Sequence, residues 1–366
     1  MPAAAYLPQT PDLKHLGNVP LGDPSGAAAR RLERLIGRGL SARLSTDLSK
    51  ITEADAVATD RFFVRTAAPQ KLPDKVEPNA WTIDIGGLAE SVPRVTAASL
   101  ETLTRRSGRY LLECSGNSDP SSYGLLSTAD WEGVPLLDLV DRVLPSSAPS
   151  TSRILVSGLD DESDPGRTST PGASWIFSRD ELSRALLAVG MNGAPLPRDH
   201  GAPVRLIVPG WYGCSCIKWV NAIELVADAA AATSQMREFA GRTHQPAGAM
   251  LARDFIAATI DTAAMPVRVD KWMVDGRPEY RVTGIVWGGT TPTNALSIRF
   301  RSGGAWTRVE HCPLPDSTLT WSLWTHTWRP TEPGRYQIVL RVDDPKVRTR
   351  RLDVFFYVRE VQIDEV

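Results

Sequence analysis

The last third of the chain consists of short apolar runs separated by turns, and this feature restricts the possible folds more than any other. Strand-like runs occur at residues 280–287, 295–300, 319–328, 336–341 and 352–358. Turn sequences such as Ser302-Gly-Gly and Glu332-Pro-Gly separate them. Short strands at this spacing are typical of a β-sandwich, which we predict for residues 246–366.

The part before it alternates between two kinds of pattern. Strand-like runs occupy residues 81–85, 153–157 and 204–208, and helical patterns occupy 134–143 and 178–187. Mixed patterns with many Pro and Gly turns predict an α+β domain over residues 51–245. Residues 1–50 are predicted to be an N-terminal extension, in which the Leu and Ile spacing of residues 28–40 favours a short helix.

Charge and hydropathy exclude several classes of function. The formal net charge of the 366 residues is −1 and no basic block occurs, which argues against binding to nucleic acid or to an anionic membrane. No apolar run has membrane-spanning length, and the first residues lack the pattern of a secretory signal. These features predict a cytoplasmic protein.

Four cysteines are too few for a disulfide framework. Cys214 and Cys216 are too close together for a typical zinc pair, and no Cys/His set completes such a site. Cys114 ends an apolar run and begins the turn Cys114-Ser-Gly-Asn117, where a thiol is well placed to be exposed and to become a thiolate. The alternative is a buried free cysteine at a strand end.

Two further segments place basic residues beside apolar strands. The run Asp60-Arg-Phe-Phe-Val-Arg-Thr66 carries Arg65, for which the alternative is an edge arginine in a salt bridge. The stretch from Pro195 to Trp219 carries His200, Arg205 and Lys218 around a short strand. A histidine before a strand is more often a structural hydrogen bonder than a ligand.

Six segments together resemble the sulfite oxidase family of molybdenum-cofactor enzymes in order and approximate spacing. They are Phe62-Phe-Val-Arg65, Glu113-Cys-Ser-Gly-Asn117, Ser127-Thr-Ala-Asp-Trp131, Gly158-Leu-Asp160, Asn192-Gly-Ala-Pro-Leu-Pro-Arg-Asp-His-Gly-Ala-Pro-Val-Arg205 and Ile217-Lys-Trp219. The resemblance extends from about Phe62 to Val226. It implies a mixed α/β molybdopterin-binding domain followed by an immunoglobulin-like β-sandwich that serves dimerisation.

The resemblance also implies a cofactor and its ligands. Molybdenum would be held by a pterin dithiolene and by the thiolate of Cys114. The residues implied in molybdopterin binding are Phe63, Val64, Arg65, Asp160, His200, Arg205, Cys216, Ile217 and Lys218. Arg and Lys are suited to the phosphate of the cofactor because they donate charge-assisted hydrogen bonds.

The implied reaction is oxygen-atom transfer to a small sulfur compound such as sulfite, which with water gives sulfate and two electrons. The chain has no haem attachment motif, so a separate electron-carrier protein is expected, with a cytochrome as one candidate. A homodimer is expected as well. The resemblance places Arg65, Trp131 and Phe239 at the substrate cavity, although a large aromatic such as Trp131 serves equally well as a core residue.

The chain also departs from the family pattern. Ser118, Asp119 and Ser322 stand where arginines are often found, and Phe239 stands near the place of an active-site tyrosine. These departures leave open a relative that acts on a sulfane, a sulfoxide or nitrate. A cofactor-binding protein with an impaired catalytic pocket is a further alternative, and a Trp-rich interaction module is a third.

Overall fold

The computed structural model describes residues 13–22, 36–38, 41–52, 56–66, 72–88, 94–103, 105–118, 122–143, 153–159, 173–301, 304–349 and 358–366. The chain divides into two compact units, each with its own buried residues. The larger unit is formed within residues 31–260 together with 318–320, and the smaller unit within residues 1–30, 261–317 and 321–366.

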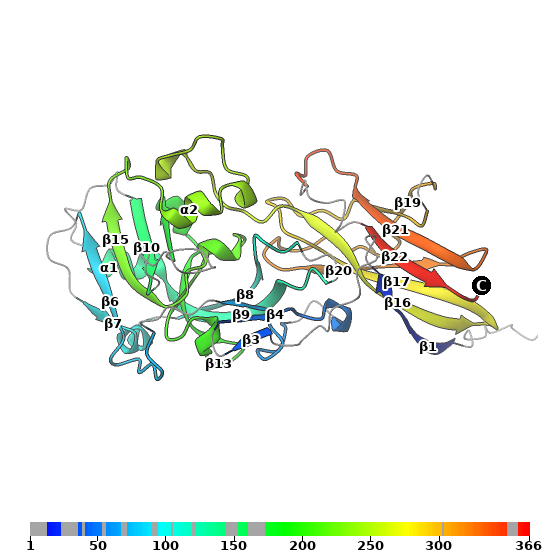
Figure 1. The fold of residues 1–366 in the computed structure, drawn as a ribbon, viewed down its shortest axis with the longest axis horizontal. Coiled ribbons are helices and arrows are strands. Elements are labelled where there is room, and N and C mark those ends of the chain that lie inside the picture. Colours follow the sequence, from blue (N-terminus) through cyan, green and yellow to red (C-terminus); the bar gives the residue numbers. More distant parts are fainter. Residues whose placement is uncertain are drawn as a thin grey trace, which may run out of the picture. The chain divides into compact units, whose positions relative to one another are not determined.

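The first sheet of the larger unit is mixed and has the strand order β11-β10-β15-β6-β7. Its strands are β6 (Thr82–Gly87), β7 (Val95–Thr96), β10 (Arg153–Gly158), β11 (Ser174–Phe177) and β15 (Val220–Val226). β15 and β6 run parallel, whereas the other pairs are antiparallel. Every second residue of β10 is buried, so one face of this strand lies on the core. Helix α2 (Ser234–Glu238) packs beside β11 (Figure 1).

The second sheet is antiparallel in the order β13-β12-β9-β8, with β14 also paired to β12. Its strands are β8 (Arg106–Glu113), β9 (Leu126–Pro135), β12 (Leu186–Met191), β13 (Ala194–Pro195) and β14 (Arg205–Ile207). Helix α1 (Leu136–Val143) follows β9 without a break. A small antiparallel sheet contains β3 (Ile36–Arg38), β4 (Ser41–Leu44) and β5 (Val64–Thr66).

Short 3-10 helices connect these strands. They are η1 (Leu48–Lys50), η2 (Ala98–Thr102), η3 (Asp180–Leu182), η4 (Arg198–His200), η5 (Gly213–Ser215), η6 (Gly241–Thr243) and η7 (Ala252–Asp254). The described part of the larger unit contains two α-helices, so this unit is richer in sheet than the sequence pattern indicated.

The smaller unit contains two antiparallel sheets, in the orders β1-β16-β17-β20 and β19-β18-β21-β22-β2 (Figure 1). Their strands are β1 (Leu13–Val19), β2 (Leu21–Gly22), β16 (Ala263–Val274), β17 (Arg277–Trp287), β18 (Leu296–Arg299), β19 (Thr307–Arg308), β20 (Ser322–Trp328), β21 (Gly334–Val342) and β22 (Val358–Ile363). Trp328 joins the sheets, since its ring stacks on Phe300 at 4.2 Å and meets Tyr336 edge-on at 4.8 Å. Aromatic packing therefore explains part of the tryptophan content of this region.

Most predicted strands are confirmed, including those at residues 81–85, 153–157, 204–208, 280–287 and 336–341. The predicted helix at 134–143 is confirmed from Leu136, because Val134 and Pro135 still belong to β9. The predicted run at 319–328 is a strand only from Ser322, because residues 318–320 belong to the larger unit.

The predicted helix at residues 178–187 is wrong. Only Asp180–Leu182 forms a single 3-10 turn, and β12 begins at Leu186. The run Leu186-Leu-Ala-Val189 is continuously apolar, which suits a central strand as well as a buried helix. This run forms strand β12 because it pairs with β9 on one side and with β14 on the other.

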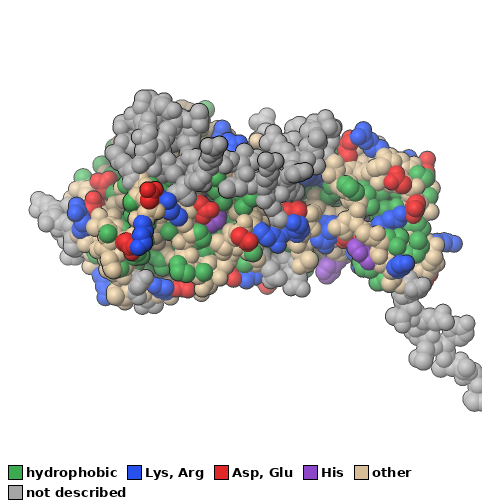
Figure 2. All heavy atoms as spheres, turned by 60° about the horizontal axis from the view of Figure 1, so that its bottom comes forward, with side chains coloured by type: hydrophobic (Ala, Val, Ile, Leu, Met, Phe, Trp, Pro, Cys, Tyr) green, Lys and Arg blue, Asp and Glu red, His purple; other side chains and the backbone are tan. Residues whose placement is uncertain are grey.

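The helix expected at residues 28–40 lies mostly outside the described residues, and its described part, Ile36–Arg38, is a strand instead. Residues 352–357 of the last predicted strand also lie outside the described residues, and β22 starts at Val358. No helix in the described part of the chain combines the length and apolar character that a membrane span needs. On the face drawn in Figure 2, Lys and Arg side chains lie interspersed with Asp and Glu.

Candidate functional site

Cys114 lies on a tight turn directly after β8. Its backbone N–H donates to the Leu125 carbonyl at 3.0 Å, and its own carbonyl accepts from the Asn117 N–H at 2.9 Å. The buried Asn117 side chain closes the turn, because it donates to a Glu113 carboxylate oxygen at 3.3 Å and accepts from the Leu125 N–H at 3.2 Å. These hydrogen bonds hold Cys114, a residue that is partly exposed, in a fixed place.

Two arginines from different segments act on this thiol. Burial raises the pKa of Cys114 above its ordinary value, and the nearby Glu113 carboxylate raises it further. The positive charges of Arg65 and Arg242 oppose this rise in pKa. Without a metal, the thiol is therefore protonated at neutral pH, whereas coordination to a metal would deprotonate it.

Strand β5 carries Arg65 between buried neighbours. The rings of Phe62 and Phe63 stack at 5.1 Å, and the Phe63 N–H donates to Ser127 Oγ at 3.2 Å. Val64 is buried and Arg65 is half-buried. Burial and the charge of Arg43, its partner in the register of β4 and β5, lower the pKa of Arg65.

The loop before β14 buries His200. It lies at the end of η4, and Gly201 follows in the left-handed conformation with φ of 111°. The imidazole meets the Phe62 ring edge-on at 5.3 Å. Burial, together with the charges of Lys218 and Arg205, lowers the pKa of His200 to about 3. His200 is therefore neutral at physiological pH, and it donates a hydrogen bond to the Thr59 carbonyl.

Arg205, the first residue of β14, is a buried guanidinium. It is 4% exposed, and its Nη1 donates to the His200 carbonyl at 3.2 Å. The guanidinium lies over the Trp131 ring at 5.4 Å, and its Nε has no hydrogen-bond partner. Burial lowers the pKa of Arg205 to about 10, so it stays charged at neutral pH. Within the described residues it forms no ion pair, which makes it a prepared site for an anion.

Lys218 follows the turn around η5 and reaches the same region. Its Nζ donates to Thr66 Oγ1 and, at 2.6 Å, to the Asp199 carbonyl. Two glycines allow neighbouring segments to pack closely against Lys218. A Cβ on Gly201 would lie 3.0 Å from the Lys218 Cβ, and a Cβ on Gly158 would lie 2.3 Å from the Lys218 carbonyl oxygen. The position of Lys218 therefore depends on these glycines.

His200, Arg205 and Lys218 form what we call the buried basic cluster. One arginine, one lysine, one neutral imidazole and the buried Arg205 Nε without a partner fit a phosphate-bearing cofactor. The cluster is linked to Cys114 through β5, because Thr66 contacts Lys218 while the preceding Arg65 acts on the thiol. The structure thus brings most of the predicted site residues into one region of the larger unit.

The other predicted residues lie as follows. Ile217 and Cys216 are buried, with the Ile217 carbonyl accepting from the Leu206 N–H at 2.8 Å and the Cys216 thiol accepting from the Val208 N–H at 3.4 Å. Trp131 is fully buried between Phe62 and Arg205. It therefore belongs to the surroundings of the buried basic cluster.

The residues at which the chain departs from the family pattern are only partly described. Ser118 is exposed, and its hydroxyl donates to the Gly116 carbonyl at 3.4 Å. Ser322 begins β20 in the smaller unit. Asp119 and Asp160 lie outside the described residues. Phe239 is the C-cap of α2, and its ring supports the guanidinium of Arg242 at 5.4 Å.

Two arginines that act on Arg65 were missed from the sequence. Arg43 lies on β4 opposite Arg65, and Arg242 lies on η6. Neither belongs to a motif, since they are separated from Cys114 by 71 and 128 positions in the chain. Only the pairing of β4 with β5 and the packing of the segment after α2 bring them to the site.

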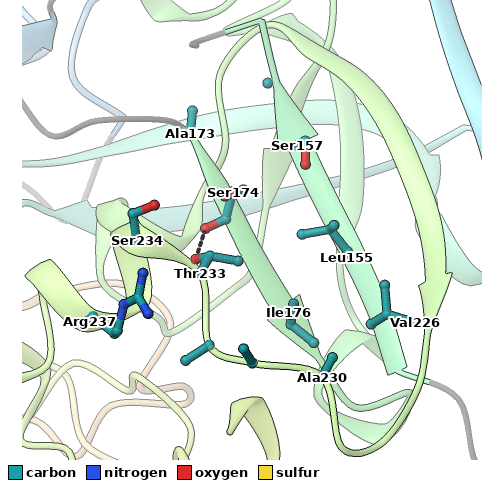
Figure 3. A pocket seen from close by; sticks show the side chains of 13 residues that line it. Leu155, Ser157, Ala173, Ser174, Ile176, Val226, Ala230, Thr233, Ser234 and Arg237 are labelled. Carbon is teal, nitrogen blue, oxygen red and sulfur yellow. Dashed lines mark hydrogen bonds between the residues drawn. The ribbon is translucent and has the colours of Figure 1, made fainter. Parts of the chain in front are cut away.

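A pocket of about 460 Å³ lies between strands β10 and β11 and the segment from Val226 to Arg237. Figure 3 shows Leu155, Ser157 and Val226 on one side of it and Ser234 and Arg237 on the other. Thr233 Oγ1 donates to the Ser174 carbonyl at 2.8 Å beside it. None of the predicted site residues lines this pocket.

Comparison with known families supports the motif-based resemblance. The family described as oxidoreductase molybdopterin binding domain matches residues 69–234. The sulfite oxidase of Gallus gallus is 28% identical over 327 residues, covering 80% of this chain and 68% of that protein. The mitochondrial sulfite oxidase of Homo sapiens is 27% identical over 302 residues, covering 75% and 53%. The chain thus spans about half the length of the mouse and human enzymes.

A nitrate reductase from Spinacia oleracea is also similar, with 31% identity over 167 residues that cover 40% of this chain and 18% of that protein. Among solved structures, the sulfane dehydrogenase SoxCD from Paracoccus pantotrophus matches with a TM-score of 0.65. The match covers 92% of this chain and 90% of that one at 16% identity. At this identity the match shows a shared fold.

Proposed function

This chain belongs to the sulfite oxidase family of molybdopterin oxidoreductases, and on that premise we propose that it transfers an oxygen atom to a sulfur compound, with sulfite as the first candidate. The observation that carries the proposal is the environment of Cys114, a partly exposed residue on a fixed turn whose thiol is acted on by Arg65 and Arg242. A thiolate suits a soft metal, and guanidinium groups suit an oxyanion.

The residues present fit molybdopterin. Cys114 would hold the metal, and Arg205 and Lys218 would hold the phosphate, with His200 as a neutral donor. The pterin would be lined by Phe63, Val64, Arg65, Cys216 and Ile217. The contact of Asp160 with the cofactor stays a prediction. When bound, the cofactor supplies a molybdenum centre that exchanges an oxygen atom with the substrate and takes up two electrons.

The protein's own contribution is to position and to neutralise charge. Arg65 would bind a substrate oxygen through its guanidinium. Burial of Trp131, Phe62 and Phe63 around the basic cluster excludes water, which strengthens the electrostatic contacts made there. The two electrons would leave to a separate electron-carrier protein, for which a cytochrome is our candidate.

Other substrates are candidates as well, because Ser118, Asp119 and Ser322 stand where the family often has arginines. A relative with fewer arginines would suit a sulfane, a sulfoxide or nitrate. Steady-state assays of all four substrate classes with ferricyanide, or with a reduced dye for nitrate and sulfoxide, separate these alternatives. Sulfite turnover at a rate above that of the other compounds would support our first candidate.

The proposal is tested by metal analysis of protein made in a host that synthesises the cofactor. We expect close to one molybdenum per chain, a pterin fluorophore after oxidation, and sulfite-dependent reduction of the acceptor. Absence of both metal and pterin would contradict the proposal. Full metal loading without turnover of any compound would favour a cofactor-binding protein with an impaired pocket.

We further propose that the smaller unit is an immunoglobulin-like β-sandwich that makes a homodimer. Its two antiparallel sheets and aromatic core support this assignment. Light scattering at micromolar concentration should give twice the chain mass of 39.9 kDa. A mass of one chain would remove the dimer proposal and would leave an interaction module for a different partner.

A further inference from the structure

Three arginines from separate segments lie near one another, since the charges of Arg43 and Arg242 both act on Arg65. Arg43 on β4 lies directly opposite Arg65 on β5 in the antiparallel register. Arg242 reaches the same place from η6: its Nη1 lies 3.5 Å from the point where a Cβ on Gly116 would sit, and Cys114 Sγ lies 3.8 Å from that point. The guanidinium of Arg242 and the thiol thus border one small space that Gly116 leaves open.

Arg43, Arg65 and Arg242 form what we call the arginine cluster, which gathers three positive charges. Within the described residues, none of the three forms an ion pair with an Asp or Glu. Burial lowers the pKa of Arg65, and the charges of Arg43 and Arg242 lower it further. Like charges on directly opposed strand residues destabilise a sheet, and an anion bound among them would remove that cost.

Contacts with Phe239 also hold Arg242 in place. Its guanidinium lies over the Phe239 ring at 5.4 Å, and its backbone N–H donates to the Phe239 carbonyl at 3.0 Å. The preceding helix α2 is anchored because the Gln235 amide donates to the Cys214 carbonyl. A guanidinium whose base is fixed loses less entropy when it binds a ligand.

We propose that Arg242, with Arg43, completes around Arg65 an anion-binding subsite for the substrate, in place of the arginines that this chain lacks at Ser118 and Asp119. This inference rests on the proposed function and narrows its substrate class to oxyanions, which include sulfite, thiosulfate and nitrate and leave out neutral sulfoxides. A neutral sulfoxide carries no net charge for three guanidinium groups to bind, whereas an oxyanion accepts charge-assisted hydrogen bonds from each of them.

The first test is kinetic and uses the molybdenum-loaded enzyme. In Arg242→Gln we expect KM for sulfite to rise about tenfold to a hundredfold with kcat within about threefold, because a charged hydrogen bond used for binding is lost. Arg43→Gln should show a smaller rise, since Arg43 acts on Arg65 and not directly on the thiol. The exposed Arg237 on α2 is the matched control, and Arg237→Gln should leave KM unchanged.

The second test needs no turnover. In cofactor-free protein, alkylation of Cys114 by iodoacetamide is followed by mass spectrometry with and without sulfate, at constant ionic strength. We expect sulfate to slow alkylation at Cys114 in the wild type and in Arg237→Gln, and to have at least about tenfold weaker effect in Arg242→Gln. Cys312 in the smaller unit is the internal control thiol.

The outcomes separate this inference from the proposed function. An unchanged KM for sulfite together with unchanged sulfate protection in Arg242→Gln would overturn the anion subsite while leaving the enzyme assignment intact. Sulfate protection that depends on Arg242 in a protein that binds no molybdenum would support the subsite while overturning the proposed function. Matching thermal unfolding curves for the variants and the wild type show that the fold is preserved.

Discussion

The buried basic cluster and the arginine cluster hold positive charge in opposite ways. Arg205 and Lys218 are packed among aromatic rings and donate to backbone carbonyls, so their positions are set by the fold. Arg43 and Arg242 are exposed and form no ion pair in the described part of the chain, and the Arg242 guanidinium lies near the Cys114 thiol. The first arrangement suits a group that stays bound, and the second suits a ligand that exchanges.

The largest effect is expected at Cys114, on whose thiol Arg65 and Arg242 of the arginine cluster act. Cys114→Ser should reduce turnover by more than about a hundredfold, because a hard hydroxyl is a poor substitute for a thiolate on a soft metal. Pterin should stay bound, since Arg205 and Lys218 are unchanged. Turnover and pterin content are both measured, with Cys214→Ser as the control. Loss of pterin together with activity would show that the thiolate is also needed to retain the cofactor.

Arg205→Met tests the buried cluster alone. Pterin and molybdenum content should fall at least about tenfold, because a charged donor to the phosphate is lost. The cofactor-free protein should become more stable by about 1–3 kcal/mol, since a buried charge without a counter-ion is removed. Urea unfolding and metal analysis measure the two effects. Arg179→Met removes an exposed ion pair with Asp141 and should change neither by a measurable amount.

The contrast between the clusters also explains what the sequence could predict. His200, Arg205 and Lys218 lie within 19 residues around one strand, so local sequence brings them together. The arginine cluster depends on a strand pairing and on the path of the chain after α2, which no local pattern encodes. The same limit explains the wrong helix at 178–187, because only the neighbouring strands β9 and β14 decide the state of its apolar run.

Gly158→Ala tests the close packing of the buried cluster. The added Cβ would lie 2.3 Å from the Lys218 carbonyl oxygen, so the backbone must shift. We expect a loss of stability near the upper end of the overpacking range, about 3 kcal/mol, and reduced pterin content. Unfolding in urea and fluorescence of the oxidised pterin report the two changes. An alanine variant as stable as the wild type would mean that the Lys218 turn is adaptable.

Acid should weaken the larger unit through His200. Its pKa is lowered to about 3 in the folded protein, whereas an exposed histidine titrates near 6.5, so the unfolded state binds a proton that the folded state refuses. The stability that depends on neutral His200 is therefore present above about pH 6.5 and is lost as the pH decreases. The expected loss is about 2 kcal/mol between pH 7 and pH 5. Urea titrations at both pH values should show this loss in the wild type and not in His200→Gln. Equal losses in both proteins would assign the acid sensitivity to other groups.

The smallest effect on stability is expected at Gly116, the counterpart of Gly158 in the arginine cluster. A Cβ there would make only ordinary contacts, 3.5 Å from Arg242 Nη1 and 3.8 Å from Cys114 Sγ. Gly116→Ala should change the free energy of unfolding by less than about 0.5 kcal/mol. It should still raise KM for sulfite severalfold, because the methyl group occupies the space that the guanidinium and the thiol border. Unchanged KM would place the bound anion on the Arg43 side of Arg65, away from Gly116, and would separate the two halves of the arginine cluster.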